Sequence, residues 1–359
     1  MIRSRRRDPD PPVARPPVLL LTRDRALADH VAALAEAAGA ALLVRAAVPG
    51  RAGEAPLTLI GQDVAADLPA GHRGGVLVVR AEGADPPEGV WRQAVQIGAD
   101  RVAVLPEAEP WLLEELADAA RTGPASRIVA VLPGSGGAGA STLAVALAVT
   151  AAHRGARSVL LDVDPLGGGL DLALGLDRVP GLRWPDVPSG PGRWPPGLVT
   201  TALPEIGGVR VLACSRDEPV PLRPDRVGAA VDAAARESDL VVVDLPRQVT
   251  ATEVEVLSRS SVALVVVAAE VRAAAAAAQL SAAAGLLGPE LRVVVRPRAP
   301  GGLDPAAVAD ALELPLAVRL VGDPAAAALM DRGEAAALAG RGPLAQVCRE
   351  LLAEVEPPW

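Results

Sequence analysis

The chain has 359 residues and a formal charge of −8, from 35 basic and 43 acidic side chains, so about two domains with a sizeable core are expected. A pI near 5.1 argues against general nucleic-acid binding, which needs a basic surface, and His30, His72 and His153 lack the spacing of metal ligands. Phe, Tyr and Lys are absent, so the core is expected to consist of Val, Leu and Ala, and arginine has to supply every positive charge except that of histidine.

The cysteine content and the first residues bear on location. Two cysteines, Cys214 and Cys348, do not make a disulfide framework and favour a reducing, cytoplasmic compartment. Residues 1–16 are expected to form a disordered tail, because Asp8, Asp10 and several prolines interrupt a start that would otherwise resemble a signal peptide. No apolar stretch reaches ~18 residues without a charge, so no transmembrane segment is predicted.

Strand-like and helix-like segments then alternate, the pattern of a parallel sheet covered by helices. A first domain is predicted over residues 17–122, and residues Arg121–Ser126 are expected to form a short linker. The expected strands are Val18–Thr22, Ala41–Val44, Leu57–Ile60, Gly75–Val79 and Arg101–Leu105, and the helices Ala26–Ala38, Val90–Ile97 and Trp111–Ala120. Short Pro/Gly-rich spans flank the third strand, so the crossover helices on either side of it are expected to be shortened or lost.

A second domain is predicted over residues 126–359. Its expected strands are Arg127–Leu132, Ser158–Val163, Val209–Ala213, Leu240–Asp244, Val262–Val267 and Leu291–Val295. The alanine-rich run Val271–Leu287 predicts a helix, since alanine has the highest helix propensity. Five prolines make Trp184–Pro196 a long irregular loop, in which Trp184 and Trp194 either mark a partner surface or cap the core.

A glycine-rich stretch lies between the strand that begins at Arg127 and an apolar helix expected over Leu143–Ala152. Its glycines let the backbone curl, so that the amides and the helix N-terminus form an anion cradle. Gly134-x4-Gly139-Ala140-Ser141 matches the spacing of a P-loop, except that the expected lysine is Ala140. The stretch therefore predicts a phosphate-binding loop without its lysine.

The same glycines also satisfy the dinucleotide fingerprint, as Gly134-x-Gly136-x-x-Gly139, with an acid at the end of the next strand. The P-loop is favoured because the acids come as a pair, Asp162 and Asp164, and a later strand ends in a carboxylate as a Walker B strand does. An NAD(P)-binding oxidoreductase is kept as the less favoured alternative.

Three segments resemble, in order, the deviant Walker A loop, the switch segment and the Walker B strand of MinD/ParA ATPases: Gly134–Thr142, Val159–Asp171 and Asp239–Pro246. Three further segments resemble the actinobacterial CpaE-like branch: Gly181–Asp186, Asp244–Arg247 and Gly342–Leu344. That branch includes septum-site-determining proteins called Ssd and often lies near Tad-type secretion and pilus genes. The resemblance covers roughly residues 126–355.

The resemblance implies ATP and Mg²⁺ as cofactors and assigns roles by position. Ser141 would ligate magnesium, Asp244 would hold it through water, and Asp164 would position the attacking water with Asp162 beside it. The nucleotide-binding residues would be Gly134, Ser135, Gly136, Gly137, Ala138, Gly139, Ala140, Ser141, Thr142, Arg296 and Pro297. The backbone from Gly136 to Thr142 would hold the phosphates, and Arg296 and Pro297 would lie near the base.

The two lysines of the family are replaced here by Ser135 and Ala140. A charge-assisted bond contributes ~1.5–3 kcal/mol, so each loss weakens binding roughly 10- to 150-fold, and removing a clamp on transition-state charge costs ~10² in rate. We therefore expect weak ATP binding with slow or no hydrolysis. The alternative is an active ATPase in which an arginine, such as Arg247, replaces lysine.

The implied role is a localisation or assembly factor for septum-site determination or for Tad/Flp-type pilus and secretion machinery. Its partners would be proteins of that machinery and a second copy of the chain, reached from the cytoplasm. The final helix, predicted at Pro343–Val355, is expected to pack on its own domain rather than on a membrane, because its polar face carries Arg349 beside Glu350 and Glu354.

The first domain resembles the receiver-like domain that precedes the ATPase in CpaE and TadZ proteins. Gly98–Pro106 matches the last strand of a receiver, with Leu105 where lysine is usual, and Asp24 alone remains of the acidic cluster. Asp63 lies slightly late for a phosphoacceptor. The predicted fold is thus α/β, with a degenerate receiver-like, flavodoxin-like domain, here a docking or dimerising module, before a three-layer, mostly parallel P-loop NTPase-like domain.

Overall fold

The structure is a computed structural model that divides the chain into two compact units, Met1–Gly123 and Pro124–Trp359. It describes residues 17–46, 55, 57–68, 75–81, 89–99, 101–120, 126–188, 194–195, 197–216, 220–297, 302–340 and 342–355. The tail expected over residues 1–16 and most of the predicted linker lie outside the described residues.

The first unit is built on a five-stranded parallel sheet with the order β2-β1-β3-β4-β5. Its elements are β1 Val18–Leu21, α1 Arg25–Ala37, β2 Leu42–Arg45, β3 Thr58–Gly61, the 3-10 turn η1 Ala65–Asp67, β4 Val76–Arg80, α2 Val90–Ile97, β5 Arg101–Leu105 and α3 Glu109–Ala120. This strand order is that of the flavodoxin-like fold, which receivers share, and it confirms the predicted fold of this domain.

Both faces of this sheet are covered, because alternate residues of each strand point to opposite sides. Val18 and Leu20 pack with α1 and α3, whereas Leu19 and Leu21 pack with α2 and η1. Within the described residues between β3 and β4, the only helical element is η1, so the prediction of a reduced crossover is confirmed there.

The second unit contains an eight-stranded sheet with the order β13-β12-β11-β6-β10-β7-β9-β8, parallel except for the β8–β9 pair. Its strands are β6 Arg127–Pro133, β7 Ser158–Asp162, β8 Glu205–Ile206, β9 Val209–Leu212, β10 Leu240–Asp244, β11 Val262–Ala268, β12 Glu290–Arg296 and β13 Leu316–Arg319. Its helical elements are α4 Ala140–His153, α5 Leu170–Ala173, α6 Leu198–Ala202, α7 Pro224–Glu237, α8 Ala251–Leu257, α9 Val271–Gly285, α10 Pro305–Leu312, α11 Pro324–Asp331, η2 Ala335–Ala339 and α12 Pro343–Val355.

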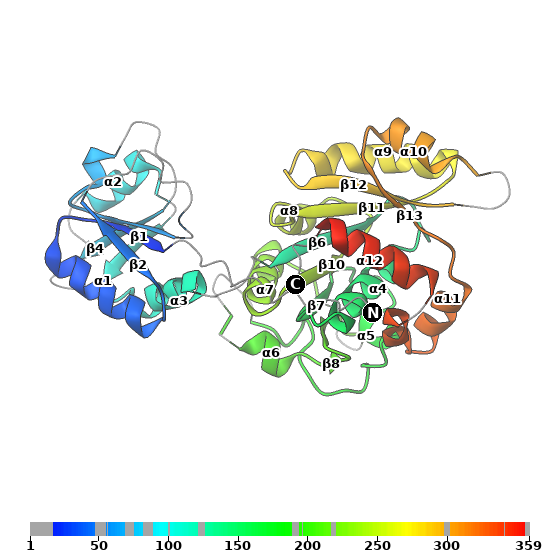
Figure 1. The fold of residues 1–359 in the computed structure, drawn as a ribbon, viewed down its shortest axis with the longest axis horizontal. Helices are drawn as coiled ribbons and strands as arrows, with labels where there is room; N and C mark the ends of the chain where they lie inside the picture. Colours follow the sequence, from blue (N-terminus) through cyan, green and yellow to red (C-terminus); the bar gives the residue numbers. More distant parts are fainter. Residues whose placement is uncertain are drawn as a thin grey trace, which may run out of the picture. The chain divides into compact units, whose positions relative to one another are not determined.

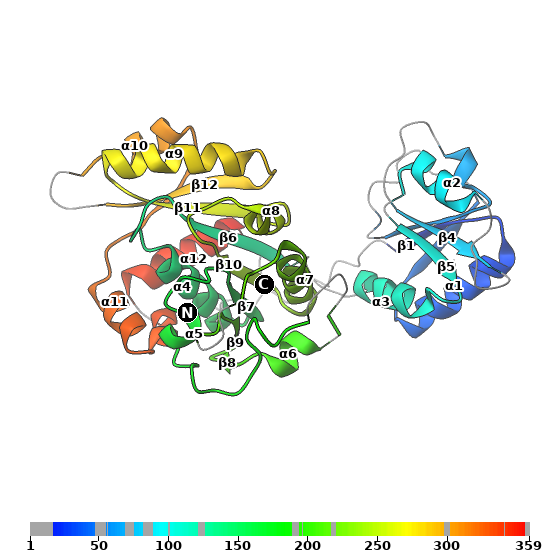
Figure 2. The same ribbon diagram turned by 180° about the vertical axis from the view of Figure 1, so that it is seen from behind.

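Helices cover both faces of this sheet and make three layers (Figures 1 and 2). One face packs against α7, α8, α9 and α10, and the other against α4, α11, η2 and α12. Helix α4 carries the chain away from the glycine-rich loop and is buried almost all round, because α12 lies over it. This arrangement fixes the loop at the carboxyl end of β6.

Burial shows where the two tryptophans of the proline-rich loop and the apolar residues of α12 lie. Trp184 is 0% exposed and Trp194 3% exposed, and both belong to the core on the α7 side. They therefore cap the core, and the reading of these rings as a partner surface is wrong. Leu344, Val347 and Leu351 of α12 are buried against α4 and η2, as the packing prediction required.

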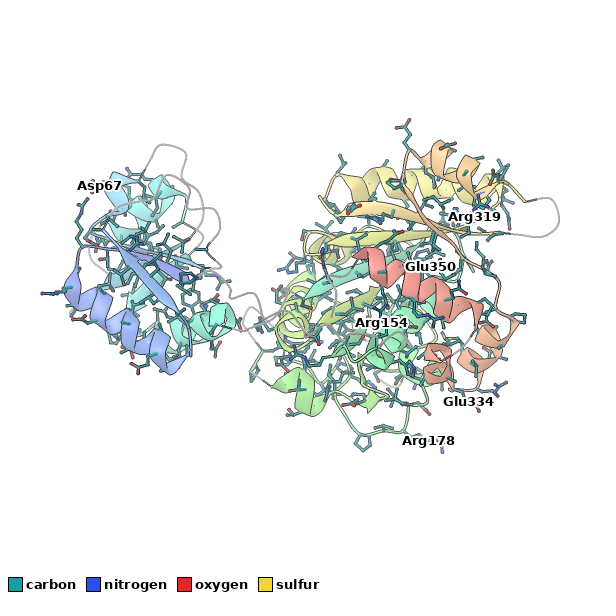
Figure 3. The ribbon with its side chains drawn as sticks, viewed as in Figure 1. Asp67, Arg154, Arg178, Arg319, Glu334 and Glu350 are labelled. Carbon is teal, nitrogen blue, oxygen red and sulfur yellow. The ribbon has the colours of Figure 1, made fainter. Side chains whose placement is uncertain are left out.

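Charged side chains are exposed on both units, among them Asp67 and Arg178. Arg178 projects from the edge of the second unit, where its side chain is 95% exposed (Figure 3). Among the described residues, no helix has the length and hydropathy needed to cross a membrane.

Candidate functional site

The glycine-rich loop remains open as an anion cradle. Gly137 and Gly139 adopt φ values of 67° and 98°, which favour glycine, and no side chain caps the N-terminus of α4 at Gly139. The amides of Gly136 and Gly137 form no hydrogen bond with any described residue. Together with the unpaired amides of the first turn of α4, they present a group of N–H donors to an anion.

Gly134 is required by packing rather than by its φ. A Cβ at this position would lie 2.8 Å from Cγ2 of Val267 and 2.9 Å from Cβ of Ala277. Gly134→Ala is therefore expected to lower the free energy of unfolding by about 1–3 kcal/mol through overpacking. The matched control is Gly136→Ala, whose Cβ would meet nothing within 4 Å. Urea unfolding of the two variants measures the difference, and equal stabilities would contradict this account.

Carboxylates gather on one flank of the loop. Asp162 ends β7 and Asp244 ends β10, and the two residues are register partners in the parallel pair. Both line a cavity of about 290 Å³ beside the first turn of α4. Its walls are formed by Ser141, Asp162, Asp164, Gly167, Gly168, Gly169, Leu170, Leu172, Ala173, Asp244, Met330 and Asp331. The three acids assigned by the resemblance are thus brought together with Ser141.

Asp162 braces the segment that follows β7. Its Oδ1 accepts from the amide of Asp164 at 3.2 Å and its Oδ2 from that of Leu170 at 3.0 Å. Burial raises the pKa of Asp162 to about 6, against the effect of these two N–H donors, and the charges of Asp164 and Asp171 add to the rise. Asp164 is only partly buried, and its Oδ1 accepts from the amide of Leu166 at 3.1 Å.

Asp244 is 3% exposed, and its Oδ1 has no hydrogen-bond partner in the described part of the chain. Burial raises the pKa of Asp244 to about 8; the neighbouring Ser141 hydroxyl lowers it, and the charges of Asp162 and Asp164 raise it further. A buried, unpartnered carboxylate oxygen beside a serine hydroxyl fits a Mg²⁺ ion, which keeps several waters and takes its other ligands from phosphates. Among the described residues, no group of three or more His, Cys, Asp or Glu side chains could hold a metal ion by itself.

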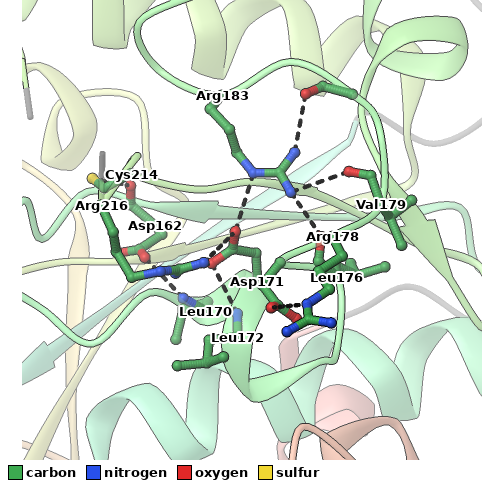
Figure 4. Close-up of polar contacts among 12 residues, drawn as sticks. Asp162, Leu170, Asp171, Leu172, Leu176, Arg178, Val179, Arg183, Cys214 and Arg216 are labelled. Atoms are coloured by element: carbon green, nitrogen blue, oxygen red, sulfur yellow. Dashed lines mark hydrogen bonds and ion pairs between the residues drawn. The ribbon is translucent and has the colours of Figure 1, made fainter. Parts of the chain in front are cut away.

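An ion-pair cluster around the buried Asp171 supports the segment that carries these carboxylates (Figure 4). Asp171, 3% exposed, accepts from Nε of Arg183 at 3.1 Å and from Nη1 of Arg216 at 2.7 Å. Burial alone would raise the pKa of Asp171, but the hydrogen bonds from Arg216 and Arg183 outweigh it, and the pKa is lowered. The cluster ties the turn after Gly169 to the loop that carries Trp184.

The Trp184 ring completes this support. Its Nε1 donates to the backbone oxygen of Asp162 at 2.7 Å, and Sγ of Cys214 contacts the same oxygen at 3.6 Å. Burial, with the charges of nearby carboxylates, raises the pKa of the Cys214 thiol, so Cys214 is unsuited to act as a nucleophile. Sequence reasoning did not find this support, because its members lie far apart along the chain.

Arginines gather on the opposite flank of the loop, where a pocket of about 640 Å³ opens. It is lined by Ser135, Gly136, Arg247, Ala268, Glu270, Arg272, Ala273, Ala276, Arg296 and Pro297. Arg296 and Pro297, which the resemblance assigns to the base, line this pocket together with Ser135 and Gly136 of the loop, and so does Arg247. Arg272, which lies at the start of α9 after β11, was not predicted as a site residue.

The receiver-like unit uses its acids for structure. Asp63, two residues beyond β3, accepts from Oγ1 of Thr22 at 2.8 Å and from the amide of Arg23. Asp24 caps α1, and the buried Leu105 ends β5 where a receiver carries lysine. Asp63 thus links the end of β3 to the turn after β1, and β5 ends in an apolar residue.

The strand order separates the two interpretations of the glycines. In the dinucleotide-binding order the first and second strands of the fold are neighbours. Here β10 lies between β6, which carries the loop, and β7. The carboxylate of Asp244 is thereby placed next to the loop, and the topology does not fit the NAD(P) alternative.

Sequence comparisons agree with the division of the chain into two units. Residues 21–127 match an Rv3660c-like, CheY-like N-terminal domain, and residues 125–284 match the ParA family of NUBPL iron-transfer P-loop NTPases. The uncharacterized proteins Rv3660c and MT3760 of two Mycobacterium tuberculosis strains are each 38% identical over 274 residues. These matches cover 75% of the chain and 77% of each relative.

Solved structures share the fold of the second unit. The septum site-determining protein MinD of Pyrococcus horikoshii, complexed with Mg-ADP, matches with a TM-score of 0.54 at 19% identity, over 64% of this chain and 96% of its own. A ParA family ATPase of Chlorobium tepidum matches with 0.52 at 16%, over 64% and 98%. MinD in the MinC:MinD complex of Aquifex aeolicus matches with 0.53 at 20%, over 65% and 98%.

Proposed function

The chain belongs to the Rv3660c-like family, in which a CheY-like domain precedes a MinD/ParA-type P-loop NTPase domain. From this premise, we propose that it is a nucleotide-responsive localisation or assembly factor. It binds ATP with Mg²⁺ weakly and hydrolyses it slowly or not at all. It serves septum-site determination or a Tad/Flp-type pilus and secretion machine, from the cytoplasm and through protein partners.

One observation carries the nucleotide part of this proposal. The open amides of the glycine-rich loop lie beside Ser141 and the unpartnered buried oxygen of Asp244. Amides can hold the phosphates, Ser141 and Asp244 can hold the metal, and Asp164 can orient a water molecule. The Mg-ADP complex of a MinD with the same fold supports this choice of ligand.

Weak ATP binding and slow hydrolysis are expected because the positive charge of the P-loop lysine is missing. The chain has no lysine, and Ala140 is buried at the start of α4, where the cation of a P-loop would stand. Amides and Mg²⁺ bind the ground state, whereas catalysis depends on groups that meet the charge of the transition state more strongly. Binding without rapid turnover suits a protein that signals by its bound state.

Thermal unfolding of the full chain with ATP, ADP or NAD, each with Mg²⁺, tests the proposal. ATP at about 100 times its dissociation constant should stabilise the protein by ~2.7 kcal/mol, and the gain should depend on Mg²⁺. NAD should produce no shift. Stabilisation by NAD but not by ATP, or no stabilisation by any of the three nucleotides, would contradict the proposal.

An active ATPase is the second candidate, because arginines beside the loop can replace the positive charge of the P-loop lysine. Release of inorganic phosphate under saturating ATP separates it from the first candidate. Turnover that falls in Asp164→Ala without loss of ATP binding would establish the ATPase, whereas binding without measurable turnover supports the scaffold. The MinC:MinD complex supports the expectation of protein partners, and pull-down experiments with ATP and without it would identify them.

A further inference from the structure

Three arginines beside the glycine-rich loop differ from most arginines of the second unit. Arg157 pairs with Asp239, Arg259 with Asp232, and Arg292 with Glu290. By contrast, the side chains of Arg247, Arg272 and Arg296 form no hydrogen bond or ion pair with any described residue. All three line the pocket of about 640 Å³, where the described lining residues include three arginines and a single carboxylate, Glu270.

The topology explains why these arginines meet. Arg247 follows β10, Arg272 follows β11, and Arg296 ends β12. In the sheet, β11 and β10 are the neighbours of β6, and β12 is the next strand beyond β11. Since the carboxyl ends of parallel strands meet at one edge, the three side chains surround the loop that leaves β6.

Arg296 comes nearest to the anion cradle. Its Nη1 lies 4.0 Å from the position that a Cβ on Gly139 would occupy, and Gly139 is the N-cap of α4. The guanidinium group therefore stands beside the amides of the first turn, next to buried Ala140. Arg247 and Arg272 line the same pocket, to which Ser135 and Gly136 of the loop also contribute.

We propose that Arg296, assisted by Arg247 and Arg272, is a phosphate clamp that supplies the positive charge for the polyphosphate of a nucleotide in a chain without lysine. This inference rests on the proposed function and gives Arg296 a role other than contact with the base. The clamp and the carboxylates lie on opposite flanks of the loop, so the phosphates bind Mg²⁺ on one side and guanidinium forks on the other. Arginine suits this task because it donates two parallel bonds to phosphate oxygens.

The test measures dissociation constants of the full chain for ATP, ADP and sodium tripolyphosphate, each with Mg²⁺. Arg296→Ala is expected to weaken ATP and tripolyphosphate binding roughly 10- to 150-fold, and Arg296→Lys to recover part of that loss. Arg247→Ala and Arg272→Ala should each have smaller effects. Arg154→Ala is the matched control, since Arg154 is exposed at the other end of α4 and its removal should leave all three constants unchanged.

The outcomes separate the clamp from the nucleotide function. If ATP binds the wild type and Arg296→Ala binds it equally well, the clamp is wrong and the proposed function stands. If tripolyphosphate binds through Arg296 but ATP and ADP do not bind, the arginine site stands and the nucleotide function fails. If the wild type binds none of the three, both are overturned. Equal unfolding curves of the ligand-free variants exclude a loss of folding as the cause.

Discussion

Replacing Asp171 by alanine is expected to lower the free energy of unfolding by about 3–5 kcal/mol, because it leaves two guanidinium groups without their carboxylate. The side chain of Arg183 is 13% exposed and that of Arg216 42% exposed, so water compensates Arg216 better, and the lower end of this range is expected. Urea unfolding at pH 7 measures the loss.

Asp177→Ala is the matched control for that experiment. Asp177 pairs at 3.8 Å with Arg178, whose side chain is 95% exposed, and surface pairs of this kind contribute only about 0–1 kcal/mol. The pKa of Asp171 is lowered in the folded state, so its contribution is present at neutral pH and is lost only as the pH falls below about 4. A loss under 1 kcal/mol in Asp171→Ala would show that the cluster is not a structural support.

Replacing Asp244 by asparagine is expected to have two effects of opposite sign. Without ligands the variant should be more stable than the wild type at pH 8, by about 2–5 kcal/mol, because a buried charge is removed. With Mg²⁺ and ATP, the stabilisation seen in the wild type should be absent, because the buried oxygen that faces the metal has lost its charge. Thermal unfolding with ligands and without them measures both effects.

The pH dependence fixes the sign of the first effect. The pKa of Asp244 rises from 3.8 to about 8 on folding, so the native state binds more protons than the unfolded state between these values. The ligand-free wild type therefore loses stability as the pH rises from about 4 to about 8, and the difference from Asp244→Asn should vanish near pH 4. Asp310→Asn, at an exposed position of α10, serves as the control and should change neither property. A variant that still responds to Mg²⁺ and ATP would exclude Asp244 from the metal site.

Local patterns predicted the elements of the sheets well, because buried parallel strands are continuous apolar runs. The predicted strand Arg101–Leu105 and helix Val90–Ile97 agree with β5 and α2 at both ends. The strands β8 and β13 were not predicted, since β8 has only two residues, too few for a periodicity, and β13 is an edge strand with no fully buried residue. Burial of Trp184 also escaped prediction, because a proline-rich loop does not reveal which of its side chains turn inward.

The sequence was enough to predict the phosphate loop and the carboxylates of its acidic flank. Glycine spacing sets the curl of the backbone, and an acid at the end of a strand must lie at the edge of the sheet. Which edges adjoin was decided only by the packing of the whole domain. The order β12-β11-β6-β10-β7 brings Arg296 and Arg272 to one side of the loop and Asp162 and Asp244 to the other. Arg247 follows β10 and lines the arginine pocket from that side. Strand order depends on how helices on both faces bury their apolar sides together, and no short stretch of chain encodes that.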